Sequence, residues 1–266
     1  RQIINSDAKI INRLGSNALA NYLLVNKGVY ATDEDVPVNP ATGERMKAAN
    51  NKNNGYVYMQ AGDPIWVDVN GDYIIDDKDK VVVGNSQPRL TGGFNANLRY
   101  KSFSINTNFS FTIKRDIINK ALADRFAAYG NPLSKDLNGS GAITPIEAFD
   151  FWKEDHIYAK YPNPFDYIRG GTADHQVNFF RPDQTLFMED GSFLKINGVS
   201  ISYVLPKKVL DFLRVERVQL NASVNNIYTF SKYSGVNPEN VNSLGYDVSG
   251  GYPNSRNYTM GVSIDF

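Results

Sequence analysis

The sequence has no cysteine, no excess of charge and no long hydrophobic run. The absence of cysteine excludes disulfide frameworks, thiolate metal sites and cysteine nucleophiles. Its 28 basic residues are balanced by 28 acidic ones, so no overall field attracts nucleic acid or an anionic surface. No stretch approaches the roughly 18 apolar residues of a membrane helix. Strands of a membrane barrel escape this exclusion, because each needs only about 9–11 alternating residues.

The sequence also lacks a signal peptide and the known catalytic signatures. It begins Arg-Gln-Ile-Ile-Asn-Ser-Asp, without an apolar signal core, so we expect the natural start to lie upstream of residue 1. There is no G-x-S-x-G, H-E-x-x-H, P-loop or dinucleotide-binding motif. The two histidines, His156 and His175, have no second ligand at metal spacing. We therefore expect no enzymatic activity, no catalytic residue and no nucleic-acid partner.

What the sequence does contain is strict alternation of apolar and polar residues over long runs. In residues 103–113 one set of alternate positions is mostly Phe and Ile, and the other is Ser, Asn and Thr. Residues 257–266 repeat this pattern and close on Phe266. Alternation with a period of two predicts β-strands. The strands that we predict are 94–100, 103–113, 193–205, 217–230 and 256–266.

Short and long connections alternate between these strands. Only Lys101 and Ser102 separate the first two strands, which predicts a tight hairpin. A basic segment that starts with Pro206 joins the third strand to the fourth, and we expect a short helical turn there. The connections 114–192 and 231–255 are long. Outer-membrane barrels combine short periplasmic turns with long extracellular loops, so the pattern predicts such a barrel.

The long connection 114–192 is expected to contain short helices. One is predicted near residues 116–128. A second is predicted after Thr144, because Thr-Pro-Ile-Glu at 144–147 is a capping box with proline at the first helical position.

An acidic loop at residues 68–79 has the spacing of a calcium-binding loop. Oxygen ligands at positions 1, 3, 5, 7, 9 and 12 of a twelve-residue loop are typical of Ca²⁺ sites. Tyr73 replaces the usual glycine at position six. The alternative is an acidic surface turn that binds no metal. The predicted ligands are Asp68, Asn70, Asp72, the carbonyl of Ile74, Asp76 and Asp79.

From about residue 60 to the end, the chain resembles the SusC/RagA family of TonB-dependent outer-membrane transporters of Bacteroidetes. The resemblance rests on an ordered set of short motifs. These are GDP at 62–64, DVNGD at 68–72, VGNSQPR at 83–89, GF at 93–94, AKYP at 159–162, GSFLKI at 191–196, SYVLP at 202–206, NNIYTF at 225–230, GYP at 251–253 and YTMGV at 258–262.

This resemblance implies an all-β fold, the C-terminal part of a large antiparallel transmembrane barrel that has 22 strands in the family. Residues 1–92 would be an extracellular loop region with a strand and the acidic loop. Residues 93–266 would carry the last barrel strands and their extracellular loops, with plug and earlier strands absent. The implied function is import of oligosaccharides or peptides across the outer membrane. The implied partners are a SusD-like surface lipoprotein, TonB through the absent N-terminal part, and outer-membrane lipid.

The alternative that the residues leave open is a secreted β-sandwich, such as a carbohydrate-binding module with a calcium loop. Sandwich strands also alternate, but they are shorter, about 5–6 residues. Aromatic residues at the strand ends fit either an interfacial girdle or the edge of a sandwich core. A barrel leaves Phe103, Phe109, Val262 and Phe266 uncovered by protein, whereas a sandwich buries them. Spacing assigns no substrate-binding residue in either case.

Overall fold

The computed structural model describes residues 3–4, 10–12, 20–50, 55–129, 146–166, 169–170, 176–247 and 254–266. Its internal contacts divide the chain into two compact units. The first, here called the loop unit, comprises residues 1–86, 117–189 and 241–250. The second, the sheet unit, comprises residues 87–116, 190–240 and 251–266. The sequence analysis expected an extracellular loop region at 1–92 and barrel strands with their loops at 93–266. This division concerns location relative to a membrane, and it stays a prediction.

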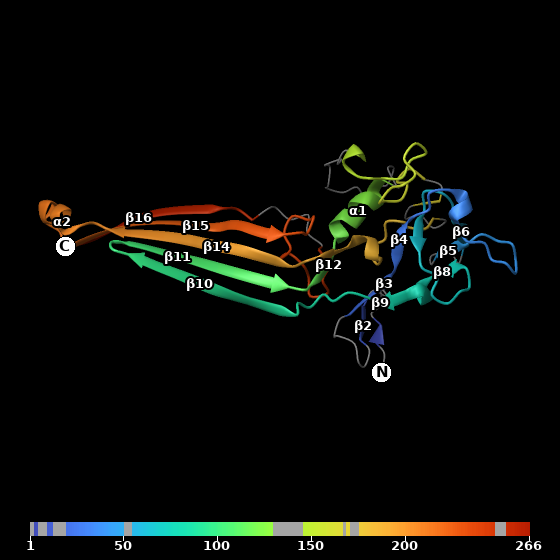
Figure 1. The fold of residues 1–266 in the computed structure, drawn as a ribbon, viewed down its shortest axis with the longest axis horizontal. Helices are drawn as coiled ribbons and strands as arrows, with labels where there is room; N and C mark the ends of the chain where they lie inside the picture. Colours follow the sequence, from blue (N-terminus) through green and yellow to red (C-terminus); the bar gives the residue numbers. More distant parts are fainter. Residues whose placement is uncertain are drawn as a thin grey trace. The chain divides into compact units, whose positions relative to one another are not determined.

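The sheet unit is one antiparallel sheet of five strands in sequence order (Figure 1). All five strands predicted from alternation are present, with ends that differ by a few residues. The strands are β10 (Leu90–Tyr100), β11 (Phe103–Ile113), β14 (Phe193–Val204), β15 (Arg217–Ser231) and β16 (Asn257–Asp265).

The short connections lie together at one end of this sheet (Figure 1). Tyr100 pairs with Phe103 across the tight hairpin, and Lys101 has a φ of 51°, as two-residue hairpin turns require. Between β14 and β15 the chain forms helix α2 (Lys207–Leu213), with Pro206 as its N-cap. The predicted hairpin and the predicted helical turn are both confirmed.

The long connection between β11 and β14 is only partly as predicted. Helix α1 (Lys120–Tyr129) confirms the helix expected near 116–128. The helix expected after Thr144 is a single 3-10 turn, Ile146–Ala148, and Thr144 itself lies outside the described residues. Two short strands that pair with each other flank this connection, β12 (Asp116–Ile118) and β13 (Met188–Asp190).

Small sheets make up the strand content of the loop unit. The four-stranded sheet contains β1 (Ile3–Ile4), β2 (Ile10–Asn12), β3 (Ala20–Leu24) and β9 (Lys80–Val82). The other strands are β4 (Asn26–Val29) with β7 (Pro64–Trp66), and β6 (Gly55–Tyr58) with β5 (Lys47–Asn50) and β8 (Ile74–Ile75). Further 3-10 turns are Asp33–Asp35, Asp77–Asp79 and Thr185–Phe187.

The loop unit has a hydrophobic core of its own. One cluster contains Trp66 and Phe179. In the other, the fully buried ring of Phe126 meets Phe151 and Tyr161 edge-on, with ring centroids 4.8 Å apart in each pair. Such contacts add ~0.5–1.5 kcal/mol per pair to the burial itself. Part of the long connection 114–192 therefore folds with the N-terminal segment and does not form an irregular loop.

A buried glutamine stabilises this core through hydrogen bonds of its side-chain amide. Gln184 Oε1 accepts hydrogen bonds from Trp66 Nε1 at 2.8 Å and Asn26 Nδ2 at 3.1 Å. Its Nε2 donates to the carbonyls of Phe179 at 2.8 Å and Arg181 at 3.0 Å. A fully buried amide with both its groups bonded is stable and specific, because any displacement leaves polar atoms without partners.

A buried ionic network lies beside Gln184. Lys80 Nζ is 2.8 Å from a carboxylate oxygen of both Asp77 and Asp183. Arg181 binds the two oxygens of Asp183 at 2.7 Å each. Burial raises the pKa of Asp183, but the hydrogen bonds and charges of Arg181 and Lys80 outweigh it and hold that pKa well below its ordinary value.

We predict that Asp183→Asn lowers the free energy of unfolding of the loop unit by ~3–5 kcal/mol, because it leaves buried cations without their carboxylate. The native pKa of Asp183 is below its unfolded value of about 3.9, so its contribution is complete above that pH and is lost as pH falls further. In the variant, the free energy of unfolding should lack this loss of the Asp183 contribution at low pH. Hydrogen exchange of peptides covering residues 176–190 in the full-length protein measures both effects.

The matched control is Asp150→Asn, which removes an exposed carboxylate that binds His156 at 2.7 Å. Exposed ion pairs contribute little to stability, so exchange should barely change. Equal effects of the two substitutions would contradict the buried network.

Candidate functional site

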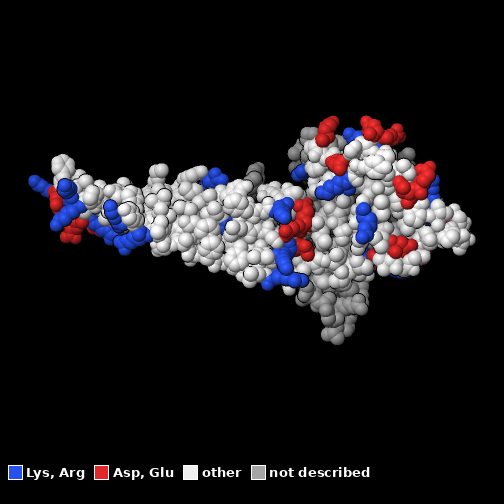
Figure 2. All heavy atoms as spheres, viewed as in Figure 1, with Lys and Arg blue, Asp and Glu red and all other residues white. Residues whose placement is uncertain are grey.

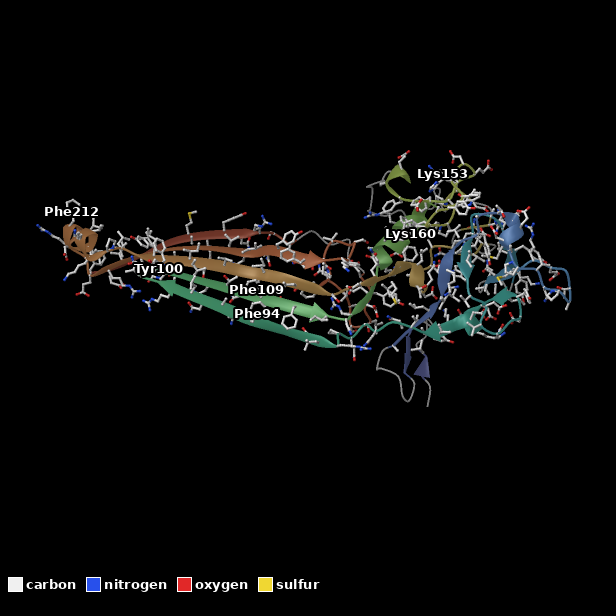
Figure 3. The ribbon with its side chains drawn as sticks, in the orientation of Figure 1. Phe94, Tyr100, Phe109, Lys153, Lys160 and Phe212 are labelled. Carbon is white, nitrogen blue, oxygen red and sulfur yellow. The ribbon has the colours of Figure 1, made fainter. Side chains whose placement is uncertain are left out.

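Strand pairing gathers the apolar residues of the sheet unit on one side, here called the apolar face. Phe103 lies opposite Tyr203 and Phe109 opposite Ile196 in neighbouring strands. Figure 3 shows Phe94 beside Phe109, and their rings stack with centroids 4.5 Å apart. The apolar face comprises Phe94, Leu98, Tyr100, Phe103, Ile105, Phe109, Phe111, Leu194, Ile196, Val199, Ile201, Tyr203, Val218, Leu220, Ala222, Val224, Tyr228, Phe230, Tyr258, Met260, Val262 and Ile264. Of these, Val218 is buried.

Side chains of the apolar face are largely uncovered. Phe103 is 49% exposed, Val262 62% and Phe266, just beyond β16, 89%. Phe109 is half-buried, chiefly by its neighbours on the same face. Packing against a second sheet would leave such residues almost fully buried. The described residues therefore show the exposed face expected of a barrel wall and contradict the sandwich.

The opposite side of the sheet, here called the polar face, carries mainly small uncharged polar residues. Arg99, Arg217 and Asp265 lie on the same face near its end with the short connections. Asn97 lies opposite Asn106, and Ser104 opposite Ser202. Lys195 also lies on this face, and its Nζ binds Glu239 at 2.5 Å. The remaining members include Thr91, Asn95, Asn108, Ser110, Thr112, Ser200, Asn221, Ser223, Asn225, Thr259 and Ser263.

The strands have the length that a bilayer requires. β10 and β11 contain 11 residues each. At about 3.4 Å per residue such a strand is roughly 37 Å long, and at a tilt of about 45° it spans roughly 26 Å. The apolar band of outer-membrane barrels is about 25 Å tall. One strand is thus sufficient to cross the hydrocarbon layer.

Aromatic residues mark both ends of the apolar face. At the end with the short connections, the Phe103 and Tyr203 rings are 4.4 Å apart. At the other end the Tyr228 and Phe230 rings are 4.6 Å apart. This arrangement fits the aromatic girdles of membrane barrels. Tyr233 lies beyond β15 and is buried, so it does not belong to this girdle.

A pair of bulges that the sequence analysis missed bends the middle of the sheet. The pairing of β14 with β11 and with β15 shifts near Asn197, and Asn226 in β15 has a φ of 55°. A Cβ on Gly198 would lie 2.9 Å from Asn225 Oδ1, so a larger residue is disfavoured there. Bulges increase strand twist and are common where barrels curve. The signal was present, because alternation slips by one residue between Ile196 and Val199.

The first half of the acidic loop has well-defined turn geometry. Asp68 accepts the backbone N–H of Gly71 at 2.7 Å and of Tyr73 at 2.8 Å. Asn70 accepts the N–H of Asp72, and Asp72 accepts the N–H of Ile74. Tyr73 has a φ of 62°, so it adopts the left-handed conformation for which glycine is usual, at a cost on the order of 1–2 kcal/mol.

The second half of the loop uses its carboxylates internally. Asp79 is buried and accepts the N–H groups of Val69 at 2.9 Å and Asp76 at 2.8 Å. Burial raises the pKa of Asp79. Asp76 binds Lys78, with its carboxylate 3.2 Å from Nζ. Calcium binding by Asp68, Asn70, Asp72, Ile74, Asp76 and Asp79 stays a prediction.

Three further features are the possible metal ligands, the two histidines and the helices. Among the residues that the structure describes, no group of three or more His, Cys, Asp or Glu is arranged to hold a metal ion. His156 binds Asp150 on the surface, and His175 lies outside the described residues. No helix in the described part of the chain is long and apolar enough to cross a membrane.

Comparison with known proteins points to one group. No family model matches the chain. The chain is 26% identical over 216 residues to TonB-dependent receptor P3 of Formosa agariphila, covering 77% of this chain and 19% of that protein. It is 26% identical over 230 residues to receptor P39 of the same organism. It is 25% identical to TonB-dependent receptor SusC of Bacteroides thetaiotaomicron, covering 95% of this chain and 24% of that protein.

Solved structures show the same fold. The RagAB peptide transporter matches over all of this chain and 25% of its own, with a TM-score of 0.64 and 20% identity. The RagAB peptide importer in its open-open state matches with a TM-score of 0.62 and 17% identity. These matched proteins are named as transporters or receptors. The chain spans about a fifth of the length of the first curated relatives, 19% and 20%. By sequence and by fold, the chain is SusC/RagA-like, a segment of the kind found in TonB-dependent outer-membrane transporters.

Proposed function

We propose that this chain is the C-terminal, membrane-embedded part of a TonB-dependent importer of the outer membrane. The observation that carries the proposal is the exposed apolar face with a polar face behind it. In a barrel the first would meet lipid and the second would line a wet interior. The complete barrel would have 22 strands, as in the family, and TonB would act through parts that this chain does not contain.

The proposed cargo is a polar nutrient, either a glycan oligosaccharide or a peptide. Asn, Ser and Thr on the polar face offer both donors and acceptors of hydrogen bonds without a net charge. Such a wall suits cargo rich in hydroxyl or amide groups. RagAB is named as a peptide importer, and this supports the peptide alternative only by likeness of fold.

The proposed partner is a SusD-like surface lipoprotein. The chain leaves β11 and β15 at the end of the sheet opposite the short connections (Figure 1). In a barrel this end would be extracellular, since short turns are periplasmic. The loop unit, built from residues 1–86 together with parts of these connections, would then be available for contact with the lipoprotein and for substrate capture. Its folded core supports this role, because a rigid unit can present a defined surface.

We also propose that the acidic loop binds Ca²⁺ and braces the loop unit. Asp68, Asn70 and Asp72 fit the first three ligand positions and are already oriented by backbone hydrogen bonds. A hard cation would supply charge neutralisation for the carboxylates and tie the two halves of the loop together. Asp79 would have to exchange its bonds to Val69 and Asp76 for the ion.

We predict that Met260→Arg in the full-length protein strongly reduces its assembly in the outer membrane. Met260 lies on the apolar face near the middle of β16, and a cation at the middle of a bilayer costs ~2–4 kcal/mol. Thr259→Arg, one residue away on the polar face, is the control and should assemble. Heat-modifiable gel mobility of the membrane fraction measures folding. Equal assembly of both variants would contradict the lipid-facing assignment.

We predict that a photo-crosslinking residue at position 158 captures the surface lipoprotein in whole cells. Tyr158 is 83% exposed and lies in the long connection near Trp152. The same crosslinker at Phe212, at the short-connection end, is the control and should capture no lipoprotein. A product from position 212 and none from 158 would reverse the assigned orientation.

We predict that Ca²⁺ raises the unfolding midpoint of the loop unit. Ligand at 100 times its dissociation constant stabilises by about 2.7 kcal/mol. Asp72→Asn should greatly reduce this gain, because the amide can keep the turn but loses the charge. Hydrogen exchange with Ca²⁺ or with a chelator measures the effect, and Asp150→Asn is the control. Unchanged exchange on addition of Ca²⁺ would show that the loop is an unmetallated turn.

A further inference from the structure

Helix α2 is amphipathic, and its apolar side is uncovered. Val209, Phe212 and Leu213 follow the i, i+3, i+4 spacing that places them on one side of a helix. Lys207, Lys208 and Asp211 occupy the other side. No residue of α2 is buried, and Phe212 is 85% exposed. Figure 3 shows Phe212 at the end of the sheet that carries the short connections.

A helix of seven residues is too short to be stable in water by itself. None of its residues is buried, and Leu210 is the one that is partly buried, so packing within the sheet unit contributes little to its stability. A large exposed ring beside two exposed aliphatic residues is the feature expected of a segment that contacts a partner.

Cations gather at the same end of the sheet. In Figure 2 blue spheres, with red ones among them, lie around α2, and charged spheres are sparse over the middle of the sheet. Lys207, Lys208 and Arg214 are exposed, and Lys101 in the adjoining hairpin lies over the ring of Tyr100 at 5.3 Å. In the described part of the chain none of these four cations belongs to an ion pair. They are free to bind an anionic partner.

The position of α2 in the chain indicates which kind of partner it contacts. It directly follows β14 and precedes β15, where Tyr203 and Leu220 pair near the end of the apolar face. A segment just beyond a lipid-facing band lies at the level of the headgroups. Amphipathic helices with cations on the polar side bind there, with apolar residues in the acyl boundary and cations at phosphate groups.

We propose that α2 is an interfacial anchor that docks on the phospholipid layer at the short-connection end of the sheet. Phe212 and Leu213 enter the acyl boundary, and Lys207, Lys208 and Arg214 bind the phosphates of anionic phospholipids. This assignment rests on the proposed function, since it requires the apolar face to meet lipid. A lipid is favoured over a protein partner because α2 lies between β14 and β15, directly beyond the end of the apolar face at Tyr203 and Leu220.

The test measures how deeply position 212 lies in a bilayer. The chain has no cysteine, so Phe212→Cys in the full-length protein, with any cysteine elsewhere replaced, carries a single spin label. The protein is reconstituted into phosphatidylethanolamine vesicles with or without phosphatidylglycerol. The depth of the spin label is obtained by comparing its relaxation by oxygen with its relaxation by a water-soluble nickel complex. We expect the label to lie below the phosphates when phosphatidylglycerol is present, and to shift toward water when it is omitted.

Variants separate the charges from the apolar contact. The triple substitution Lys207→Gln, Lys208→Gln, Arg214→Gln should shift the label toward water in both vesicles. Asp211→Asn, which removes an acid from the same helix, should leave its depth unchanged. The reference is the label at position 212, without the triple substitution, in vesicles with phosphatidylglycerol. If the label is as deep as this reference both in the triple variant and in vesicles without phosphatidylglycerol, phosphate recognition is overturned.

A second label distinguishes failure of the anchor from failure of the proposed function. Met260→Cys reports whether the apolar face is in hydrocarbon. A label at 260 in hydrocarbon with a label at 212 in water would overturn the anchor alone. Both labels in water would overturn the membrane assignment itself.

Discussion

The proposed function depends on a sheet that has one apolar and one polar face. Apolar surface left in water costs roughly 25 cal/mol per Å², and the apolar face of the sheet unit is a continuous surface of Phe, Tyr, Ile, Leu, Val and Met side chains. The described residues do not cover it. In the proposed barrel this face meets hydrocarbon, while the Asn, Ser and Thr of the polar face meet water. The alternation in each strand suits both surroundings at once.

Backbone hydrogen bonding adds a second constraint of the same origin. β10 pairs only with β11, and β16 only with β15, among the strands that the structure describes. In a bilayer an unpaired strand edge is costly, so membrane sheets close into barrels. In the proposed barrel the two edges of this sheet would therefore pair with neighbouring strands. This agrees with a chain that matches only 19–25% of the length of its relatives.

The sequence predicted the sheet unit far better than the loop unit, for physical reasons. Strands such as β11 alternate because successive side chains lie on the two opposite faces of the sheet, and a local pattern reveals this. The core of the loop unit joins residues far apart in sequence, for example Trp66 and Phe179, whose rings are 6.2 Å apart. No periodicity in the local sequence reveals such long-range contacts. The amide of Gln184 and the salt bridges of Asp183 are equally invisible, because their partners become neighbours only after folding. In the acidic loop the spacing predicted either a calcium-type loop or an acidic turn, but neither the backbone hydrogen bonds of Asp68 and Asn70 nor the burial of Asp79.

The most direct test of the account is a scan of single cysteines along β11, residues 103–113, in the full-length protein in lipid vesicles. Each position carries a spin label, and its accessibility to oxygen dissolved in the bilayer is compared with that to a water-soluble quencher. The account predicts a period of two, with oxygen maxima at Phe103, Ile105, Phe109 and Phe111 and water maxima at Ser104, Asn106 and Ser110. Labels equally shielded from lipid and water on the apolar face would show that it packs against protein, which would contradict the membrane assignment.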